Sequence, residues 1–373
     1  MDRRRFLETS FGAAATAALP VMSAAPVRLV NRTKTLFNAY YLRAHMYTCV
    51  PRQVREDLEW MAGVGTDYVS VAVLEQDLFA AVENLTLVCT EAARVGIKVL
   101  AVPARWGGLT AGAPKVPSLF SALHPETWVM DRAGRTDLAP LVSGVISSVH
   151  HPKTLAFFCD TLADVYRKLP SLAGMILDEP KGFQPDYSPA AVQALGRNAP
   201  KKAHYAAATA FYSAVCAFAK AQFHDKLTLL FGQASSSDEI HAAQAAVGPL
   251  DFFGFDGRPW DRASDRVFQG GDPTSESGKG KVLLDRGVEW IKLARSVPGR
   301  RAFFLAENHN ITAPMIDVID RGFPRLLALG ADMVSYYYYP RNVQEPERAM
   351  GVIGRHIQTF AGGARTRPMI LNR

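Results

Sequence analysis

Gly174-Met175-Ile176-Leu177-Asp178-Glu179-Pro180 is the stretch on which the interpretation of this chain depends. A short apolar run, Met175 to Leu177, ends in two adjacent acids and a proline. An apolar run bounded by a turn signal is typical of a parallel strand that is covered on both faces. Pro180 has no N–H for a strand ladder, so the strand must end there. Carboxyl groups at the end of a buried strand are costly to desolvate, which favours a chemical role over a loop-closing ion pair.

Strand-like and helix-like runs alternate on both sides of this stretch. The expected strands are short and rich in apolar residues; they are Leu36–Tyr41, Tyr68–Leu74, Lys98–Val102, Ala173–Leu177, Leu227–Phe231, Asp251–Phe255, Ala302–Ala306 and Met333–Tyr338. Helices are expected at about Gln53–Ala62, Leu78–Val95, Pro152–Lys168, Lys202–Phe223 and Pro346–Thr359. This alternation predicts an α/β fold, a single-domain (β/α)8 TIM barrel over residues 26–373. The alternative is an open doubly wound sheet, but no glycine fingerprint for phosphates follows the first strand.

The first 25 residues are expected to lie outside the barrel. Arg3-Arg4, with Phe6-Leu7 behind the pair, resembles a twin-arginine export signal. The Ala- and Gly-rich stretch from Phe11 to Ala18 is too short to span a bilayer, and small residues at 23–25 predict cleavage nearby. No other stretch reaches the roughly 18 uninterrupted apolar residues of a membrane span. The mature protein is therefore expected to be periplasmic or secreted, without a membrane anchor.

Composition and charge limit the classes of function. Of the 373 residues, 48% are hydrophobic, which is enough for a full core. The formal net charge is +7, but Lys and Arg are scattered without a basic run interleaved with aromatics, so nucleic-acid binding has little support. The four cysteines are widely spaced and lack a CxxC pattern, which disfavours a zinc site or a disulfide framework.

Two connections, residues 107–151 and 258–281, are too long to be plain crossovers. Long loops inside a compact domain are usually functional or disordered. Both follow strand ends, so both are expected to overhang the C-terminal mouth of the barrel, where such barrels carry out their chemistry.

The residues that follow the expected strands combine acids, amides, cations and aromatic rings. Aromatic faces stack on the apolar side of a sugar ring, while acids, amides and Arg bind its hydroxyls. The inventory therefore predicts a carbohydrate substrate and no cofactor. The expected substrate-binding residues are His45, Glu75, Arg105, Trp106, Gln233, Asp256, Arg258, Trp260, Asn308, His309, Tyr337 and Tyr339.

Two motifs resemble the catalytic positions of retaining barrel glycosidases. They are Leu177-Asp178-Glu179-Pro180 at the fourth strand and Leu305-Ala306-Glu307-Asn308 at the seventh. The resemblance implies that Glu179 is the general acid/base and Glu307 the nucleophile, as the two-carboxylate chemistry requires. Those enzymes usually carry Asn where this chain has Asp178.

A second likeness lies in the run from His124-Pro125-Glu126-Thr127-Trp128 to the fourth strand. It resembles the corresponding run in several uncharacterised barrel glycosidases, in which an Asp at that strand can be the nucleophile. Asp178 is therefore kept as the reserve nucleophile. Because neighbouring strand residues point to opposite sides, Asp178 and Glu179 are not both expected to face the barrel interior unless the backbone turns between them. Of the two, Glu179 is the expected catalytic residue.

Two other functions stay open at this point. Glu179, Asp256, Glu307 and His309 are ligand types suited to Mg²⁺, Mn²⁺ or Zn²⁺, and they look like the metal site of sugar isomerase and epimerase barrels. A barrel that binds sugar without catalysis is the third reading. Metal analysis of the purified protein distinguishes the glycoside hydrolase from the metal-dependent isomerase or epimerase.

Overall fold

The computed structural model describes residues 34–41, 49–112, 116–136, 144–266 and 281–361. The chain divides into a first unit, Met1–Lys34, and a second, Thr35–Arg373. The expected export signal belongs to the first unit and lies outside the described residues. The second unit contains the barrel.

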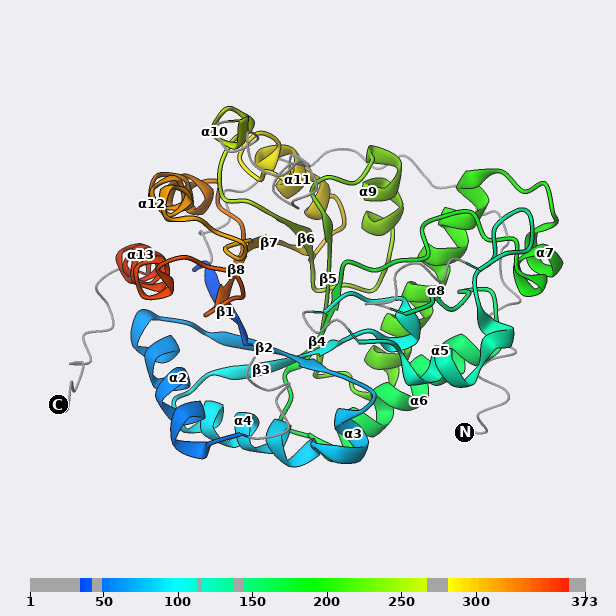
Figure 1. Ribbon diagram of the computed structural model, residues 1–373, viewed down its shortest axis with the longest axis horizontal. Helices are drawn as coiled ribbons and strands as arrows, with labels where there is room; N and C mark the ends of the chain where they lie inside the picture. The colour runs from blue at the N-terminus through cyan, green and yellow to red at the C-terminus, as the bar shows by residue number, and fades with distance from the viewer. Residues whose placement is uncertain (1–33, 42–48, 113–115, 137–143, 267–280, 362–373) are drawn as a thin grey trace. The chain divides into compact units, whose positions relative to one another are not determined.

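Eight parallel strands close into a barrel in chain order, with helices around them (Figure 1). They are β1 (Leu36–Tyr41), β2 (Tyr68–Val73), β3 (Lys98–Pro103), β4 (Gly174–Asp178), β5 (Leu227–Gln233), β6 (Phe252–Gly257), β7 (Arg301–Ala306) and β8 (Met333–Tyr338). The barrel closes where β8 pairs with β1, from Leu36 beside Met333 to Tyr41 beside Tyr338. The predicted (β/α)8 fold is confirmed, and β4 ends before Pro180 as expected.

Helices alternate with the strands. They are α2 (Pro51–Val64), α3 (Asp77–Ala80), α4 (Val82–Arg94), α5 (Leu119–Leu123), α6 (Pro152–Lys168), α7 (Pro189–Leu195), α8 (Lys201–Gln222), α9 (Asp238–Ala245), α10 (Arg262–Arg266), α11 (Gly287–Ala294), α12 (Ala313–Ala328) and α13 (Pro346–Phe360), with 3₁₀ turns η2 (Trp106–Gly108) and η3 (Pro125–Thr127). The single helix expected over 78–95 is two helices, because the backbone leaves the helical region at Ala81. Among the described residues, no helix combines the length and apolarity that a bilayer crossing requires.

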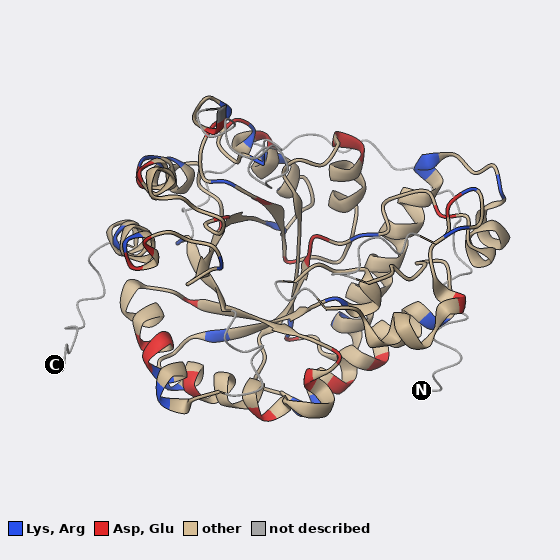
Figure 2. Cartoon of the chain, in the orientation of Figure 1, with Lys and Arg blue, Asp and Glu red and all other residues tan. Residues whose placement is uncertain are grey.

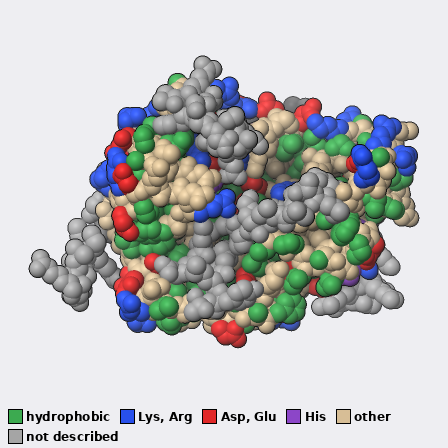
Figure 3. Space-filling model, viewed as in Figure 1, with side chains coloured by type: hydrophobic (Ala, Val, Ile, Leu, Met, Phe, Trp, Pro, Cys, Tyr) green, Lys and Arg blue, Asp and Glu red, His purple; other side chains and the backbone are tan. Residues whose placement is uncertain are grey.

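Charged side chains lie mainly on the helices and connections rather than on the strands (Figure 2). On the face shown in Figure 3, basic side chains stand in several separate groups, with acidic and hydrophobic side chains between them. Cys89, Cys159 and Cys216 are free thiols.

Alternation along the strands separates two hydrophobic layers. The larger layer lies between strands and helices and includes Val71 and Phe158. The smaller layer fills the barrel interior and includes Tyr40, Ile176 and Leu305. A parallel strand that is buried on both faces needs apolar residues at nearly every position, which is why these short runs could be recognised in the sequence.

The four tyrosines at the end of β8 show the same alternation. Tyr336 and Tyr338 point outward, where Tyr338 donates a hydrogen bond to Asp57, while Tyr337 points inward and packs on Tyr40 with ring centroids 5.1 Å apart. Tyr339 was expected, like Tyr337, to bind the substrate. Its φ of +44° ends the alternation, and its hydroxyl donates to a carboxylate on α13 instead.

Candidate active site at the barrel mouth

Asp178 and Glu179 both reach the barrel mouth because the backbone turns between them. Asp178 is the last residue of β4 and has the same parity as Ile176, which faces the interior. Glu179 has a φ of +40°, a left-handed conformation that is uncommon for a residue other than glycine. The turn brings the Glu179 carboxylate round to the mouth, where it accepts a hydrogen bond of 2.5 Å from Gln233. The condition under which both acids could face the interior is therefore met.

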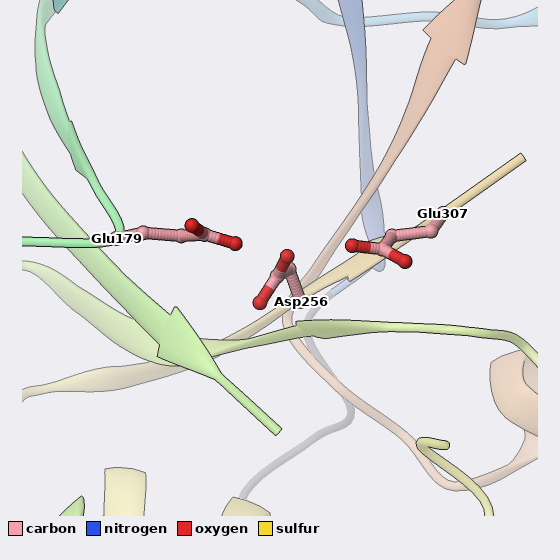
Figure 4. Close-up of side chains that lie close together, drawn as sticks. All are labelled: Glu179, Asp256 and Glu307. Atoms are coloured by element: carbon pink, nitrogen blue, oxygen red, sulfur yellow. The ribbon is translucent and has the colours of Figure 1, made fainter. Parts of the chain in front are cut away.

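Three carboxyl groups converge at this mouth. Glu179 follows β4, Asp256 lies near the end of β6 and Glu307 follows β7, and the three side chains point toward one another, with Asp256 in the middle (Figure 4). One oxygen of each lies within 4.8 Å of the others. Asp256 and Glu307 are each only 2% exposed, whereas the Glu179 side chain is 18% exposed, so water reaches the group mainly at Glu179.

The ammonium of Lys281 contacts all three carboxyl groups. Its Nζ lies 3.1 Å from Glu179 Oε1, 3.5 Å from Asp256 Oδ2 and 3.4 Å from Glu307 Oε1. The Lys281 carbonyl accepts a hydrogen bond of 2.6 Å from the Arg258 N–H, which extends the parallel pairing beyond β6. The three carboxyl groups and the ammonium therefore form one buried cluster, which we call the carboxylate–lysine cluster.

Arg258 supports this cluster from the side of Glu307. Its Nε lies 3.6 Å from Glu307 Oε2, and its Nη1 donates to the carbonyl of His309. The guanidinium carbon also lies 5.6 Å from the centre of the Trp260 ring, within the range of a cation–π contact. Arg258 is 1% exposed, so it acts as a fixed charge.

The environment separates the pKa values of the three acids. Burial alone would raise the pKa of Glu307, but the charges of Lys281, then Arg258 and His309, hold it at about 2. Burial likewise opposes ionisation of Glu179, yet Lys281 and the hydrogen bonds from Asp256 and Gln233 lower its pKa. Burial raises the pKa of Asp256 well above its usual value, and the charges of its two acidic neighbours add to the effect. Asp256 is therefore the member that keeps its proton.

Asp178 occupies a separate place beside the cluster. Its Oδ2 accepts hydrogen bonds from the Tyr40 hydroxyl at 2.8 Å and from the Gly112 N–H at 2.9 Å. Burial raises its pKa to about 7, the charge of Glu179 adds to this, and Tyr40 and Arg105 oppose it. Asp178 can thus change protonation state near neutral pH.

Aromatic rings line another part of the interior near these acids. The rings of His309 and Tyr337 meet edge to face with centroids 5.2 Å apart, and Tyr337 also packs on Tyr40. Among the residues expected at the mouth, the structure thus groups Arg105, Asp178, Glu179, Gln233, Asp256, Arg258, Glu307, His309 and Tyr337.

Other residues that were expected to bind substrate instead form hydrogen bonds and packing contacts within the fold. Both oxygens of Glu75 accept hydrogen bonds from residues 107–120, including one of 2.6 Å from the Ser118 hydroxyl, so Glu75 anchors the connection after β3. The Trp106 indole donates to the Val73 carbonyl and packs on Phe158 in the outer layer.

Trp260, Asn308 and Tyr339 are similarly engaged. The Trp260 indole donates to Asp265, and Asn308 bridges the N–H and the carbonyl of Tyr337, tying the end of β7 to β8. The Tyr339 hydroxyl donates to a carboxylate on α13. His45 lies outside the described residues.

Sequence reasoning missed Lys281 and Tyr40. Lys281 is the last residue of the long connection that begins at Arg258, so its position in the sequence was the only signal available. Tyr40 alternates with its outward neighbour Tyr41 at the end of β1, and the parity of that strand could have placed it inside.

Among the described residues, Glu179, Asp256 and Glu307 are the group whose spacing could suit a metal ion. His309, expected as a fourth ligand, is not a member of that group. Three carboxylates would suit a hard cation such as Mg²⁺ or Mn²⁺. However, the Lys281 ammonium already contacts one oxygen of each, and a second cation at that point would be repelled by it. The residues therefore fit a metal poorly while Lys281 stays in place.

Comparison with solved structures finds the same architecture in carbohydrate-active proteins. The catalytic domain of a beta-amylase from Paenibacillus polymyxa has a TM-score of 0.59 at 10% identity, covering 88% of this chain and 99% of its own. The shared architecture is the barrel. A GH5_18 protein from Streptomyces cattleya, solved with GlcNAc, has a TM-score of 0.57 at 13% identity, covering 90% of this chain and 82% of its own.

An endo-beta-1,4-mannanase from Thermotoga petrophila has a TM-score of 0.53 at 12% identity, covering 90% of this chain and 79% of its own. No protein-family model matches the chain, and no curated protein matches it in sequence. At such low identities these likenesses concern the fold alone.

Proposed function

We propose that this chain is an exported glycoside hydrolase that cleaves a glycosidic bond of an oligo- or polysaccharide with retention of configuration. The observation that carries the proposal is the buried convergence of Glu179 and Glu307 from the ends of β4 and β7, with one oxygen of each within 4.8 Å. Catalytic carboxyl groups lie about 5–5.5 Å apart in retaining enzymes and about 6.5–9.5 Å apart in inverting ones. We assign retention because Glu307 is held ionised and can therefore act as the nucleophile.

Glu307 is suited to be the nucleophile because its low pKa keeps it ionised. Its carboxylate attacks the anomeric carbon, the glycosidic C–O bond breaks, and the leaving oxygen takes a proton from Glu179. Water then attacks the anomeric carbon of the glycosyl-enzyme. It returns a proton to Glu179 and releases Glu307, so that the second step restores the first state.

The proton for the first step has a nearby source. In the free protein the pKa of Glu179 is lowered, whereas Asp256 between the two glutamates keeps its proton. We therefore assign Asp256 as the carboxyl group from which Glu179 is protonated when a leaving oxygen enters; the proton that Glu179 takes from water in the second step returns to Asp256 when the product leaves. This assignment extends the two-residue scheme expected from the sequence.

Substrate binding is assigned to the side chains around the cluster. The rings of Tyr337 and His309 offer apolar faces and edges for a sugar, while Gln233 and Arg105 can hydrogen-bond to hydroxyl groups. The names of the neighbouring structures, an amylase and a mannanase, support a carbohydrate substrate. Export is proposed from the sequence of the first 25 residues alone, in which Arg3-Arg4 precedes Phe6-Leu7 and an Ala- and Gly-rich stretch.

The test is hydrolysis of a panel of aryl glycosides and polysaccharides by the wild type and by Glu307→Gln. We expect the variant to lose several orders of magnitude in kcat, since no carboxylate remains to attack. In Glu307→Ala, added azide is expected to restore turnover and to yield a glycosyl azide of inverted configuration.

Glu91→Gln is the control, because it removes another carboxylate of low exposure, which pairs with Arg55 on the outer face. It should retain wild-type turnover. Near-normal hydrolysis by Glu307→Gln would contradict the proposal.

The rival is a divalent-metal sugar isomerase or epimerase, favoured by the three carboxylates within 4.8 Å of one another. Stoichiometric bound metal together with loss of activity in EDTA would support that reading. If the wild-type protein binds sugars but hydrolyses none of the substrates in the panel, a non-catalytic sugar-binding barrel is supported.

A further inference from the structure

The carboxylate–lysine cluster has an unusual distribution of charge. Three carboxyl groups face two cations, and Arg258 contacts only Glu307 among the three. Lys281 is the cation that the described residues place against all three at 3.1 to 3.5 Å. In a buried site each uncompensated charge is costly, so the cation that contacts all three acids offsets the charges of Glu179 and Glu307 and holds the protonated Asp256 between them.

The structure fixes the place of this ammonium through the backbone. The Arg258 N–H donates to the Lys281 carbonyl, and the Arg258 carbonyl accepts from the Leu283 N–H. These two bonds hold Lys281 beside the end of β6. The approach is so close that a Cβ on Gly257 would lie 2.9 Å from the Lys281 carbonyl oxygen. Lys281 itself is 7% exposed, unlike a solvated surface lysine.

Two carboxyl oxygen atoms in the cluster can still accept a hydrogen bond or bind a cation. Among the described residues, no donor hydrogen-bonds to Asp256 Oδ1 or to Glu307 Oε2. Both belong to side chains that are at least nine-tenths buried. Glu179, Asp256 and Glu307 each offer one oxygen within 4.8 Å of the others, and carboxylate oxygens are the ligands that a hard divalent cation binds.

We propose that Lys281 is a positioning residue that serves as the built-in cation of this site: its ammonium holds Glu179, Asp256 and Glu307 together and occupies the position that a divalent metal would otherwise take. That Lys281 positions catalytic carboxyl groups rests on the proposed hydrolase function. That Lys281 keeps a metal ion out of the cluster does not depend on that function. A lysine does this work at a fixed geometry and without any dependence on the supply of metal ions.

The decisive variant is Lys281→Met, which keeps an unbranched side chain and removes the charge. We expect Mn²⁺ to bind Lys281→Met with a stoichiometry of one per chain and about tenfold or more tightly than it binds the wild type. Isothermal titration calorimetry gives the affinity and electron paramagnetic resonance the environment of the ion. Adding Glu307→Gln to Lys281→Met should abolish the gain, which locates the ion in the cluster.

Two matched variants make the result specific. Lys281→Arg retains a cation and should bind Mn²⁺ no better than the wild type. Lys220→Met breaks the pair with Asp251, whose atoms lie 2.6 Å apart outside the cluster, and should also show no gain. A gain in either of these variants would contradict a specific role for the Lys281 charge.

The cluster without its cation is strained by repulsion, so circular dichroism and thermal unfolding must accompany the titration. If Lys281→Met does not fold, Lys281→Met combined with Asp256→Asn removes one acid together with the cation and is titrated instead. Equal Mn²⁺ affinity in the wild type and in the folded variant would overturn the proposal. Because the titration measures metal and not turnover, its failure is distinct from a failure of the hydrolase assignment.

Discussion

Asp178→Asn offers a quantitative test of the electrostatics at the mouth. In the folded protein, burial and the charge of Glu179 raise the pKa of Asp178 from 3.8 to about 7. Between these two values the folded state keeps a proton that the unfolded state has lost. Stability therefore falls as pH rises through this window, because the unfolded state binds fewer protons there.

The size of the effect follows from the shift. At pH 5 the folded-state value is two units above the ambient pH, and each unit corresponds to about 1.36 kcal/mol. The proton on Asp178 thus contributes about 2.7 kcal/mol at pH 5 and almost nothing at pH 8. Asn keeps an oxygen that can accept from Tyr40 and Gly112 but cannot titrate, so this contribution disappears in the variant.

The assay is urea unfolding of both proteins at intervals from pH 5 to pH 8. The difference in free energy of unfolding, wild type minus Asp178→Asn, should fall by about 2.7 kcal/mol over that range. Tyr40→Phe removes a donor that lowers the pKa of Asp178, so it should move the midpoint of the change to higher pH. Parallel stability curves for the wild type and Asp178→Asn would refute the reasoning.

Two further outcomes are expected. Glu179→Gln should reduce turnover of glycosides with poor leaving groups by about 10²–10⁴, but should affect dinitrophenyl glycosides far less, because these need no proton for departure. Equal losses for both substrate classes, measured as kcat/KM, would count against Glu179 as the acid. Gly112→Ala should lower the free energy of unfolding by about 1–3 kcal/mol, since φ is +93° there and a Cβ would lie 2.6 Å from that of Ala104. Urea unfolding measures this, and an unchanged midpoint would show that the turn can relax.

The barrel could be predicted because its strands are apolar on both faces and end in turn signals. The positions of Glu179, Asp256 and Glu307 followed, since residues at strand ends must gather at one mouth. The tyrosine run follows strand alternation, but only the structure shows that Tyr337 faces inward and Tyr336 and Tyr338 face outward.

Other parts of the site depend on geometry that strand periodicity does not contain. The left-handed turn at Glu179 brings two sequence neighbours to the same side, although alternation assigns them to opposite sides. Trp106 follows β3 but enters the outer layer, because Arg105 adopts a φ of +62° just before it. Lys281 comes from a connection whose path could not be read from composition.

The pairing of Arg258 with Val282 has a consequence for how such a site can change. The acids of the cluster are carried by the ends of barrel strands, whereas its cation is carried by a connecting segment. Loops tolerate substitution and changes of length better than strands do. A protein engineer could therefore replace the segment between β6 and β7 and leave the acids in place. The same barrel could then be made in two forms: one in which a lysine supplies the cation of the site, and one in which the three acids are free to bind a metal ion.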